Sequence, residues 1–255
     1  MEVLLIGAFF ALGTVLASFV GVLTVRLHTG QSFLTGRSRC DACNAQLSSG
    51  TLVPIISYLV QEGRARCCGA RLSFYAPLVE GILGVIFAMS YARIGLTLAL
   101  PCMLLALTLL LALVLYDLAH QILPPLLLAA FVAVSAGAGF LLSSSLAAFY
   151  TSCIMALILS SSLALIHFFS NGRAMGFSDA PLTLGLSLLV GSPFALAGFL
   201  FSFWIGGAIG IVLLFTRPVG SRMGIEVPFA PFLAAGFLLA YFTQWNPLAF
   251  VVASL

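Results

Sequence analysis

Long, uninterrupted apolar segments make up most of this chain of 255 residues and limit what it can fold into. About 20 apolar residues in a helix are enough to cross the hydrocarbon core of a bilayer. The segments show no alternation of apolar and polar residues, which favours helices over a barrel. We therefore predict an all-α polytopic membrane protein with about eight transmembrane helices, the sixth being short. The expected segments are 3–25, 75–92, 96–116, 121–142, 146–169, 180–192, 194–215 and 228–253.

The composition excludes several classes of protein. Hydrophobic residues make up 62% of the chain and charged residues 7%, whereas a soluble domain carries roughly 25% charged residues. This argues against a soluble enzyme, a disordered protein and a nucleic-acid binder. All ten basic residues are arginine, so lysine chemistry, such as a Schiff base or a P-loop lysine, is excluded. The first 20 residues contain no basic residue, which favours a retained first span over a cleaved signal peptide.

The arginines predict the orientation in the membrane. With eight crossings, nine arginines lie on one face and only Arg93 lies on the other. The positive-inside rule makes the nine-arginine face cytoplasmic and turns both termini outward. A second reading, in which the arginines bind anionic lipid, leaves this topology unchanged. The nine are Arg26, Arg37, Arg39, Arg64, Arg66, Arg71, Arg173, Arg217 and Arg222.

A polar loop at residues 26–74 contains four cysteines and is the one candidate for a soluble module. It is too small to build much of a core, and a reducing cytoplasm disfavours disulfides. Four thiolates fit a tetrahedral structural zinc site. The second pair is irregular, because Ala65 stands where a CxxC partner of Cys68 is expected. Zinc binding and free or redox-active thiols both remain open. The candidate ligands are Cys40, Cys43, Cys67 and Cys68.

Two aspartates lie at the ends of apolar segments, where ionisable groups are costly and are candidates for function. Two crossings separate Asp117 from Asp179, so both are expected at the cytoplasmic boundary. Two close carboxyl groups share a proton. The ionised one can activate water, while the protonated one polarises a peptide carbonyl and protonates the leaving amine. The alternative is structural: Asp179 precedes Ala180 and Pro181, which is typical of a helix cap, and Asp117 caps the next helix.

Short motifs follow one another along most of the chain, at 13–19, 25–27, 38–43, 52–59, 71–80, Asp117 with 123–124, 176–179 and 227–233. Their order and spacing resemble one known family, the bacterial type IV prepilin peptidases, also called leader peptidases, which are membrane aspartic proteases. The chain departs from the family pattern at Ala65, Pro125, Ser178 and Pro181. Ser178 replaces a glycine of a G-x-G-D motif, so we expect an altered or slightly strained turn there.

The resemblance implies a concrete activity in a bacterial inner membrane. Such enzymes cut the basic leader from type IV prepilins, or from type II secretion pseudopilins, on the cytoplasmic side and just before the substrate's apolar helix. Many then methylate the new N-terminus with S-adenosylmethionine, an activity associated with the cysteine-bearing loop. It also implies catalytic roles for Asp117 and Asp179, with Gly176 and Ser178 as motif support. The implied organisation is a first span at 1–25, a loop at 26–74 and a peptidase domain at 75–255.

Other readings stay open at this point. Glu80, at the start of the second span, is expected to pair with basic residues of the leader or with a loop arginine. A preflagellin or signal-peptide peptidase relative is a further enzymatic alternative. The departures at Ser178 and Pro181 suggest a catalytically inactive relative as another alternative. A non-enzymatic alternative is a transporter or scaffold whose cytoplasmic loop is stapled by a metal. The sequence specifies neither which pilin is the substrate nor the oligomeric state.

Overall fold

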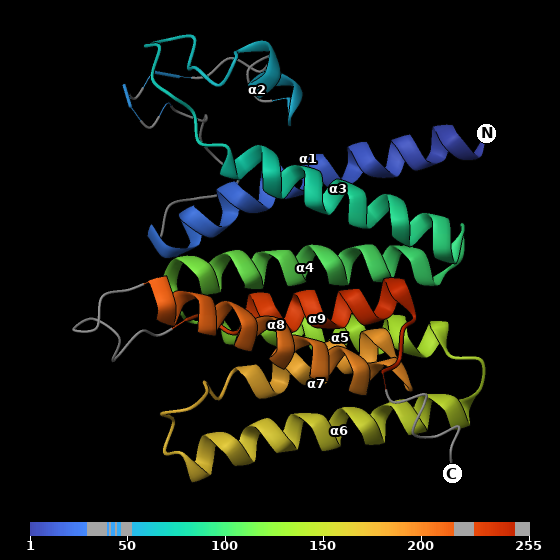
Figure 1. The fold of residues 1–255 in the computed structure, drawn as a ribbon. Coiled ribbons are helices and arrows are strands. Elements are labelled where there is room, and N and C mark those ends of the chain that lie inside the picture. Colours follow the sequence, from blue (N-terminus) through green and yellow to red (C-terminus); the bar gives the residue numbers. More distant parts are fainter. Residues whose placement is uncertain (30–39, 41, 44, 47–52, 217–226, 248–255) are drawn as a thin grey trace. The chain divides into compact units, whose positions relative to one another are not determined.

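The computed structural model describes residues 1–29, 40, 42–43, 45–46, 53–216 and 227–247 (Figure 1). Packing divides the chain into two units, Met1–Leu100 (unit 1) and Pro101–Leu255 (unit 2). Apart from isolated bridge residues at Gln46, Arg64 and Arg71, the regular structure of the described residues is helical. Four of the arginines that predict the orientation lie outside the described residues, as does the side chain of Arg26. They are Arg37, Arg39, Arg217 and Arg222.

Unit 1 is built on a close crossing of two helices. Its helices are α1 (Glu2–Thr29), α2 (Ile56–Val60) and α3 (Tyr75–Ile94). α1 packs against α3, and glycines stand where the two backbones meet. A Cβ atom added to Gly13 would lie 2.7 Å from the carbonyl oxygen of Leu83, and one added to Gly84 would lie 2.9 Å from the ring of Phe10. Small residues at this crossing let two apolar helices approach as helices do in membranes.

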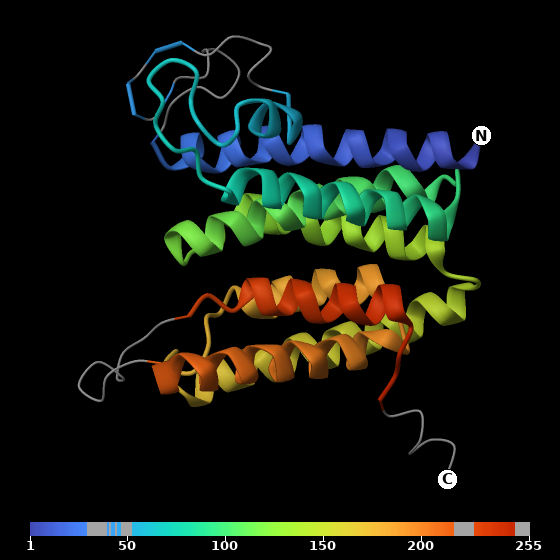
Figure 2. The ribbon, with the colours of Figure 1, turned by 45° about the horizontal axis from the view of Figure 1, so that its top comes forward.

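Unit 2 is packed around a short helix. Its helices are α4 (Ala99–His120), α5 (Pro125–Leu142), α6 (Leu146–Phe169), α7 (Asp179–Val190), α8 (Phe194–Thr216) and α9 (Ala230–Thr243). α7 contacts α5, α6, α8 and α9, and in Figure 2 its orange ribbon lies behind the red α9. Ten of its 12 residues are buried. A helix buried on nearly every side belongs in a core, and α7 takes its polar residues Asp179, Thr183 and Ser187 into that core. Gly139 on α5 packs directly against the carbonyl of Leu188 on α7, so no larger residue fits there.

Six helices are long and apolar enough to cross a membrane. They are the first 23 residues of α1, together with α3, α4, α5, α6 and α8. The other two predicted spans correspond to α7 and α9, which have 12 and 14 residues. At 1.5 Å per residue they reach about 18 and 21 Å, short of a core roughly 30 Å thick. Each predicted segment thus contains a helix, and the chain is multi-pass, but the count of eight spans is not shown. The end of the eighth segment, after residue 247, lies outside the described residues.

Candidate functional site

Both predicted aspartates line one cavity of about 640 Å³ in unit 2. Three parts of the chain form its wall: the end of α4 and the residues after it, the connection from α6 into α7, and the segment that leads into α9. Helices far apart in sequence thus bring the two carboxyl groups together. The lining residues are Asp117, Gln121, Ile122, Leu123, Gly172, Arg173, Ala174, Met175, Gly176, Ser178, Asp179, Val227, Pro228 and Phe229.

Asp117, in the last turn of α4, is held by the start of another helix. Its side chain is buried, with 7% of its surface exposed. Its Oδ2 atom accepts a hydrogen bond of 3.2 Å from the backbone N–H of Ala230, the first residue of α9. The first N–H groups of a helix have no partner within the helix. Asp117 therefore does not cap the next helix, α5, whose N-cap Pro124 has no side-chain cap bond.

Asp179 is the first residue of α7 and is as deeply buried as Asp117. Its carboxylate accepts a hydrogen bond from the backbone N–H of Gly176 and interacts electrostatically with Asp117. A Cβ atom on Gly176 would lie 3.5 Å from Oδ2 of Asp179, an ordinary van der Waals contact, so Gly176 stands directly beside the carboxylate. The N-cap position belongs to Ser178, which makes no side-chain cap bond. The helix-capping alternative for Asp179 is therefore not what the structure shows.

The serine that replaces the motif's glycine fits its position without strain. Ser178 has φ −67° and ψ −18°, which lie in or at the edge of the right-handed helical region open to any residue. The expectation of a strained turn is wrong, because this backbone does not require the left-handed conformation for which glycine is favoured. The departure at Ser178 therefore gives no structural reason to expect an inactive protein.

The connection between α6 and α7 is fixed by a residue that the sequence did not single out. The Nδ1 atom of His167 lies 2.9 Å from the carbonyl oxygen of Met175, and its ring packs edge-on against Phe177 at 5.6 Å. Its partner is a backbone carbonyl, which leaves no motif in the sequence. Arg173, used before only to count charges, also lines the cavity and is exposed. It is the one arginine among the lining residues.

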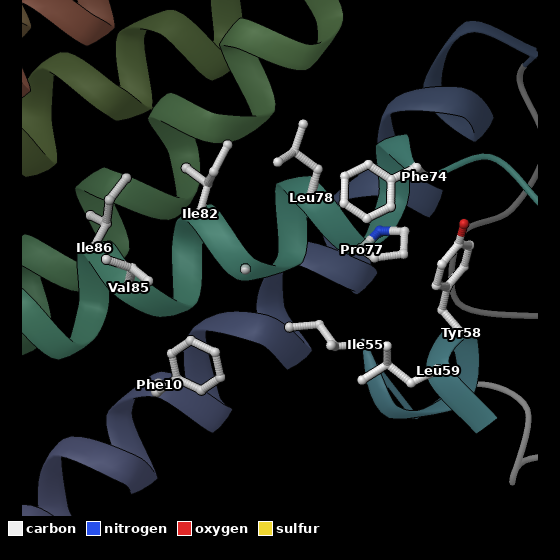
Figure 3. Close-up of a pocket in the computed structure, with 11 residues that line it drawn as sticks. Phe10, Ile55, Tyr58, Leu59, Phe74, Pro77, Leu78, Ile82, Val85 and Ile86 are labelled. Atoms are coloured by element: carbon white, nitrogen blue, oxygen red, sulfur yellow. The ribbon is translucent and has the colours of Figure 1, made fainter. Parts of the chain in front are cut away.

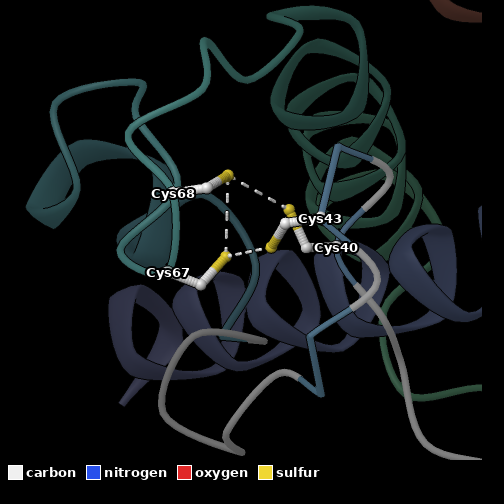
Figure 4. Close-up of side chains that lie close together, drawn as sticks. All are labelled: Cys40, Cys43, Cys67 and Cys68. Atoms are coloured by element: carbon white, nitrogen blue, oxygen red, sulfur yellow. Dashed lines mark hydrogen bonds between the residues drawn. The ribbon is translucent and has the colours of Figure 1, made fainter.

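The four loop cysteines gather into one cluster in unit 1 (Figure 4). All four Sγ atoms lie within 4.8 Å of one another. The separations are 3.3 Å for Cys43 and Cys67, 3.8 Å for Cys40 and Cys68, and 3.9 Å for Cys67 and Cys68. Zinc bound tetrahedrally to sulfur at 2.3 Å places the sulfurs about 3.8 Å apart. The four thiols therefore fit the donor set and the spacing of a structural zinc site.

The backbone explains the irregular second cysteine pair. The N–H of Cys40 bonds to the carbonyl of Ala45 at 2.9 Å, and that of Ala65 bonds to the carbonyl of Ala70 at 2.8 Å. Both turns thus close over the same interval, and Ala65 stands in the second turn where Cys40 stands in the first. The fourth sulfur comes instead from Cys67, two residues further along. Adjacent cysteines thereby reach the same cluster.

The thiols of the cluster differ in acidity. Hydrogen bonds from the backbone N–H groups of Cys43 and Ala42 lower the pKa of the Cys40 thiol to about 7. Hydrogen bonds with the side chains of Cys43 and Cys40 raise the pKa of the Cys67 thiol to about 12. Metal ligands of this kind are thiolates. Binding of a metal here is thus coupled to the release of protons.

Glu80 lies in unit 1 and has a backbone partner. The side chain is 7% exposed, and its Oε2 atom accepts a 2.8 Å hydrogen bond from the N–H of Ile55. Ile55 has φ 57° and ψ −53°, and the next N–H, of Ile56, bonds to the carbonyl of Pro54. This is a γ-turn of the rare, strained kind. Glu80 thus anchors the entry into α2 on the first turns of α3.

Comparison with known proteins shows the family. The Bacterial Peptidase A24 N-terminal domain matches residues 11–94. A Bacillus subtilis protein is 31% identical over 232 residues, 91% of this chain and 92% of its own. A Stutzerimonas stutzeri protein is 30% identical over 77% of this chain and 68% of its own, and a Vibrio cholerae protein is 24% identical over 95% and 98%. Each is named prepilin leader peptidase/N-methyltransferase. No solved structure gives a significant match. The chain belongs to the prepilin leader peptidase/N-methyltransferase family, peptidase A24.

Proposed function

We propose that this protein is a membrane-embedded aspartic endopeptidase in which Asp117 and Asp179 form the catalytic pair. The observation that carries the proposal is their meeting in one cavity, where both carboxyl groups are buried and interact electrostatically. Two carboxyl groups so placed do not both ionise readily and share one proton. That proton distribution supplies a base and an acid at the same site, and the family to which the chain belongs is named for peptidase activity.

The reaction needs only groups that line this cavity. The ionised aspartate takes a proton from a water molecule as its oxygen attacks the scissile carbonyl carbon. The protonated aspartate donates a hydrogen bond to the carbonyl oxygen, and a proton then passes to the leaving amine as the C–N bond breaks. One backbone N–H donates to each carboxylate, from Ala230 to Asp117 and from Gly176 to Asp179. These two donors hold the pair in place as its protonation changes.

The substrate is proposed to be a prepilin or a type II secretion pseudopilin. The relatives are named for prepilin leaders, and such substrates carry a short basic leader before an apolar helix. The aspartates lie at the end of α4 and the start of α7. A substrate helix inserted in the bilayer would present its leader junction at this depth. We place the peptidase within residues 75–255.

We also propose a topology in which all eight apolar helices enter the membrane and the nine-arginine face is cytoplasmic. α7 and α9 are too short for a straight crossing, but α7 is enclosed by four other helices. A short helix buried in protein does not have to match the bilayer thickness. In this topology the ends of α4 and α9 that meet at Asp117 and Ala230 lie on the cytoplasmic side, in the inner membrane of a bacterium.

The cysteine cluster is proposed to hold one structural zinc ion, because its sulfur spacing fits tetrahedral coordination. N-methylation of the new N-terminus with S-adenosylmethionine is proposed from the names of the relatives. The described part of unit 1 contains a cavity, but its lining is apolar. That cavity does not fit a charged methyl donor, so we assign no residue to the methyl transfer.

The test is a cleavage assay on the purified, membrane-reconstituted protein. A prepilin with a basic leader is added, and the new N-terminus is read by mass spectrometry with and without S-adenosylmethionine. We expect cleavage immediately before the apolar helix, and an added methyl group only when the donor is present. A folded, zinc-loaded protein that cuts none of several pilin and pseudopilin leaders would overturn the peptidase proposal.

A further inference from the structure

Unit 1 contains an apolar cavity of about 520 Å³ on α3 that the peptidase does not use (Figure 3). Phe10 of α1 lies at one end, and Tyr58 of α2 and Phe74 lie at the other. The wall between them is a single stripe of α3 that includes Leu78, Ile82 and Val85. These α3 side chains are 46 to 49% exposed. The cavity therefore opens outward along a candidate membrane span and has the size of a small-ligand pocket.

Two arginines face each other near one end of this groove. Arg64 and Arg71 form an isolated antiparallel bridge, flanked by the bonds Ala65 N–H to Ala70 carbonyl and Leu72 N–H to Gly63 carbonyl. In this narrow type of pair the Cα atoms lie about 4.5 Å apart and the side chains share one face. Like charges directly opposite each other are destabilising. Both arginines are exposed, and no described residue forms an ion pair with either.

The arginine pair is joined directly to the groove. A Cβ atom added to Gly63, which precedes Arg64, would lie 3.0 Å from the hydroxyl of Tyr58. Phe74 follows Arg71 by three residues, a distance of at most about 11 Å along the chain, and its ring packs edge-on against Tyr58 at 6.0 Å. Tyr58 and Phe74 form the end of the groove. The backbone at Arg64 and Arg71 thus lies near that end, within reach of their long side chains.

We infer that this groove binds one anionic phospholipid of the cytoplasmic leaflet, with an acyl chain along α3 and the phosphate between Arg64 and Arg71. A planar guanidinium pairs well with phosphate oxygens, and a phosphate relieves the repulsion between two arginines held opposite each other. The charge also selects between occupants. A prepilin presents a basic leader beside its apolar helix, which this pair would repel, whereas an anionic lipid combines an apolar tail with the complementary charge.

The test uses the full-length protein in nanodiscs of phosphatidylcholine. Traces of phosphatidylglycerol or phosphatidylcholine with a photoactivatable acyl chain are added, and crosslinked peptides are mapped by mass spectrometry. We expect the anionic probe to label the segments around Tyr58 and Ile82 roughly 25-fold more than the neutral probe, because each of the two arginines adds roughly fivefold to the attraction. The double variant Arg64→Gln/Arg71→Gln should lose this preference, and Arg64→Lys/Arg71→Lys should keep most of it.

A glycine pair tests the groove itself. Gly81 lines the groove, and its nearest neighbour, Cδ1 of Ile55, would be 3.9 Å from an added Cβ atom. Gly81→Leu fills this space and should reduce labelling severalfold. Gly21 on α1 has no atom within 4 Å of an added Cβ atom, so Gly21→Leu is the matched control and should label normally. Metal content and helicity confirm that each variant is folded.

The possible outcomes separate the occupants. Equal labelling by the two probes would show ordinary annular lipid and overturn the inference. If an added prepilin displaces the probe, and does so equally well in the Arg64→Gln/Arg71→Gln variant, the groove binds substrate. That result would also overturn the inference. Labelling does not depend on cleavage, so a failure here is distinct from a failure of the proposed peptidase.

Discussion

The cavity with the two aspartates and the cluster of four cysteines are held together in different ways. One aspartate stands in the last turn of the long helix α4 and the other at the start of the short, buried helix α7, and each accepts a hydrogen bond from a backbone N–H fixed by the packing of unit 2. The cysteines stand on two short turns in unit 1, and three of the four are exposed. Packing positions the first site, whereas the second has little packing and depends on what the sulfurs bind. The aspartate site should therefore keep its geometry when a side chain is substituted, whereas the cysteine site should lose its geometry when its metal is lost.

The largest expected effect is on the pair that packing holds. Asp117→Asn and Asp179→Asn keep the size of each side chain but remove the base or the acid, so each should reduce cleavage roughly 1,000-fold or more. Cleavage rates with a prepilin substrate, read beside membrane insertion and zinc content, test this. Glu62→Gln, which changes an exposed carboxylate in unit 1, is the control and should cut normally. Residual activity within tenfold of wild type in either aspartate variant would exclude the proposed mechanism.

Substitutions at the cysteine site should remove the zinc but leave cleavage intact. Cys40→Ser/Cys43→Ser removes two of the four sulfur donors, so bound zinc should fall from about one per chain to a small fraction of that. Cleavage should continue, because the aspartate cavity contains no residue of unit 1. Metal analysis and a cleavage assay measure both effects on one sample. Cys102→Ser/Cys153→Ser removes two thiols outside the cluster and should leave the zinc in place. A metal-free wild type would show that the cysteines serve another purpose.

The sequence predicted features whose signal lies within one segment better than contacts between distant segments. Continuous apolar segments predicted eight of the nine described helices, all but α2, because that signal lies within each helix. The cysteine spacing indicated a four-thiol site as one of two interpretations, and the structure brings the four sulfurs together. The partners of the aspartates are not local. That Asp117 meets the start of α9 at Ala230, or that His167 supports the carbonyl of Met175, depends on how distant helices pack. Backbone partners leave no residue pattern, which is why these contacts were missed.

The γ-turn at Ile55 shows the same limit on a smaller scale. Nothing in the residues around it predicts a positive φ at a β-branched side chain, which is unfavourable by itself. The conformation persists because a buried carboxylate 25 residues away accepts the N–H of Ile55. The sequence indicated that Glu80 needs a partner, but it pointed to a cation. The structure supplies a backbone donor instead.

Glu80 therefore gives a third prediction, of intermediate size. Glu80→Gln keeps an acceptor but loses its charge, and Glu80→Ala leaves the Ile55 N–H without its partner, at a cost of about 1–3 kcal/mol to the local structure. Amide hydrogen exchange around residues 55–60 should accelerate in the order wild type, Gln, Ala. Cleavage should fall less than tenfold. A large rise in KM for the prepilin with unchanged exchange would indicate that Glu80 contacts the substrate's basic leader instead.

The smallest expected effect concerns the serine that departs from the family motif. Since Ser178 already has φ −67°, Ser178→Gly relieves no strain and only makes the unfolded chain more flexible, which costs about 0.5–1 kcal/mol. Cleavage should stay within about twofold of wild type. Gly172 is the matched comparison on the same connection, because its φ of 73° is one that serine rarely adopts. Gly172→Ser should therefore disturb the turn before Asp179 and reduce cleavage more than Ser178→Gly does. If Ser178→Gly instead raised cleavage tenfold, the serine would be restraining the aspartate pair, and the cavity could not be considered preorganised by packing alone.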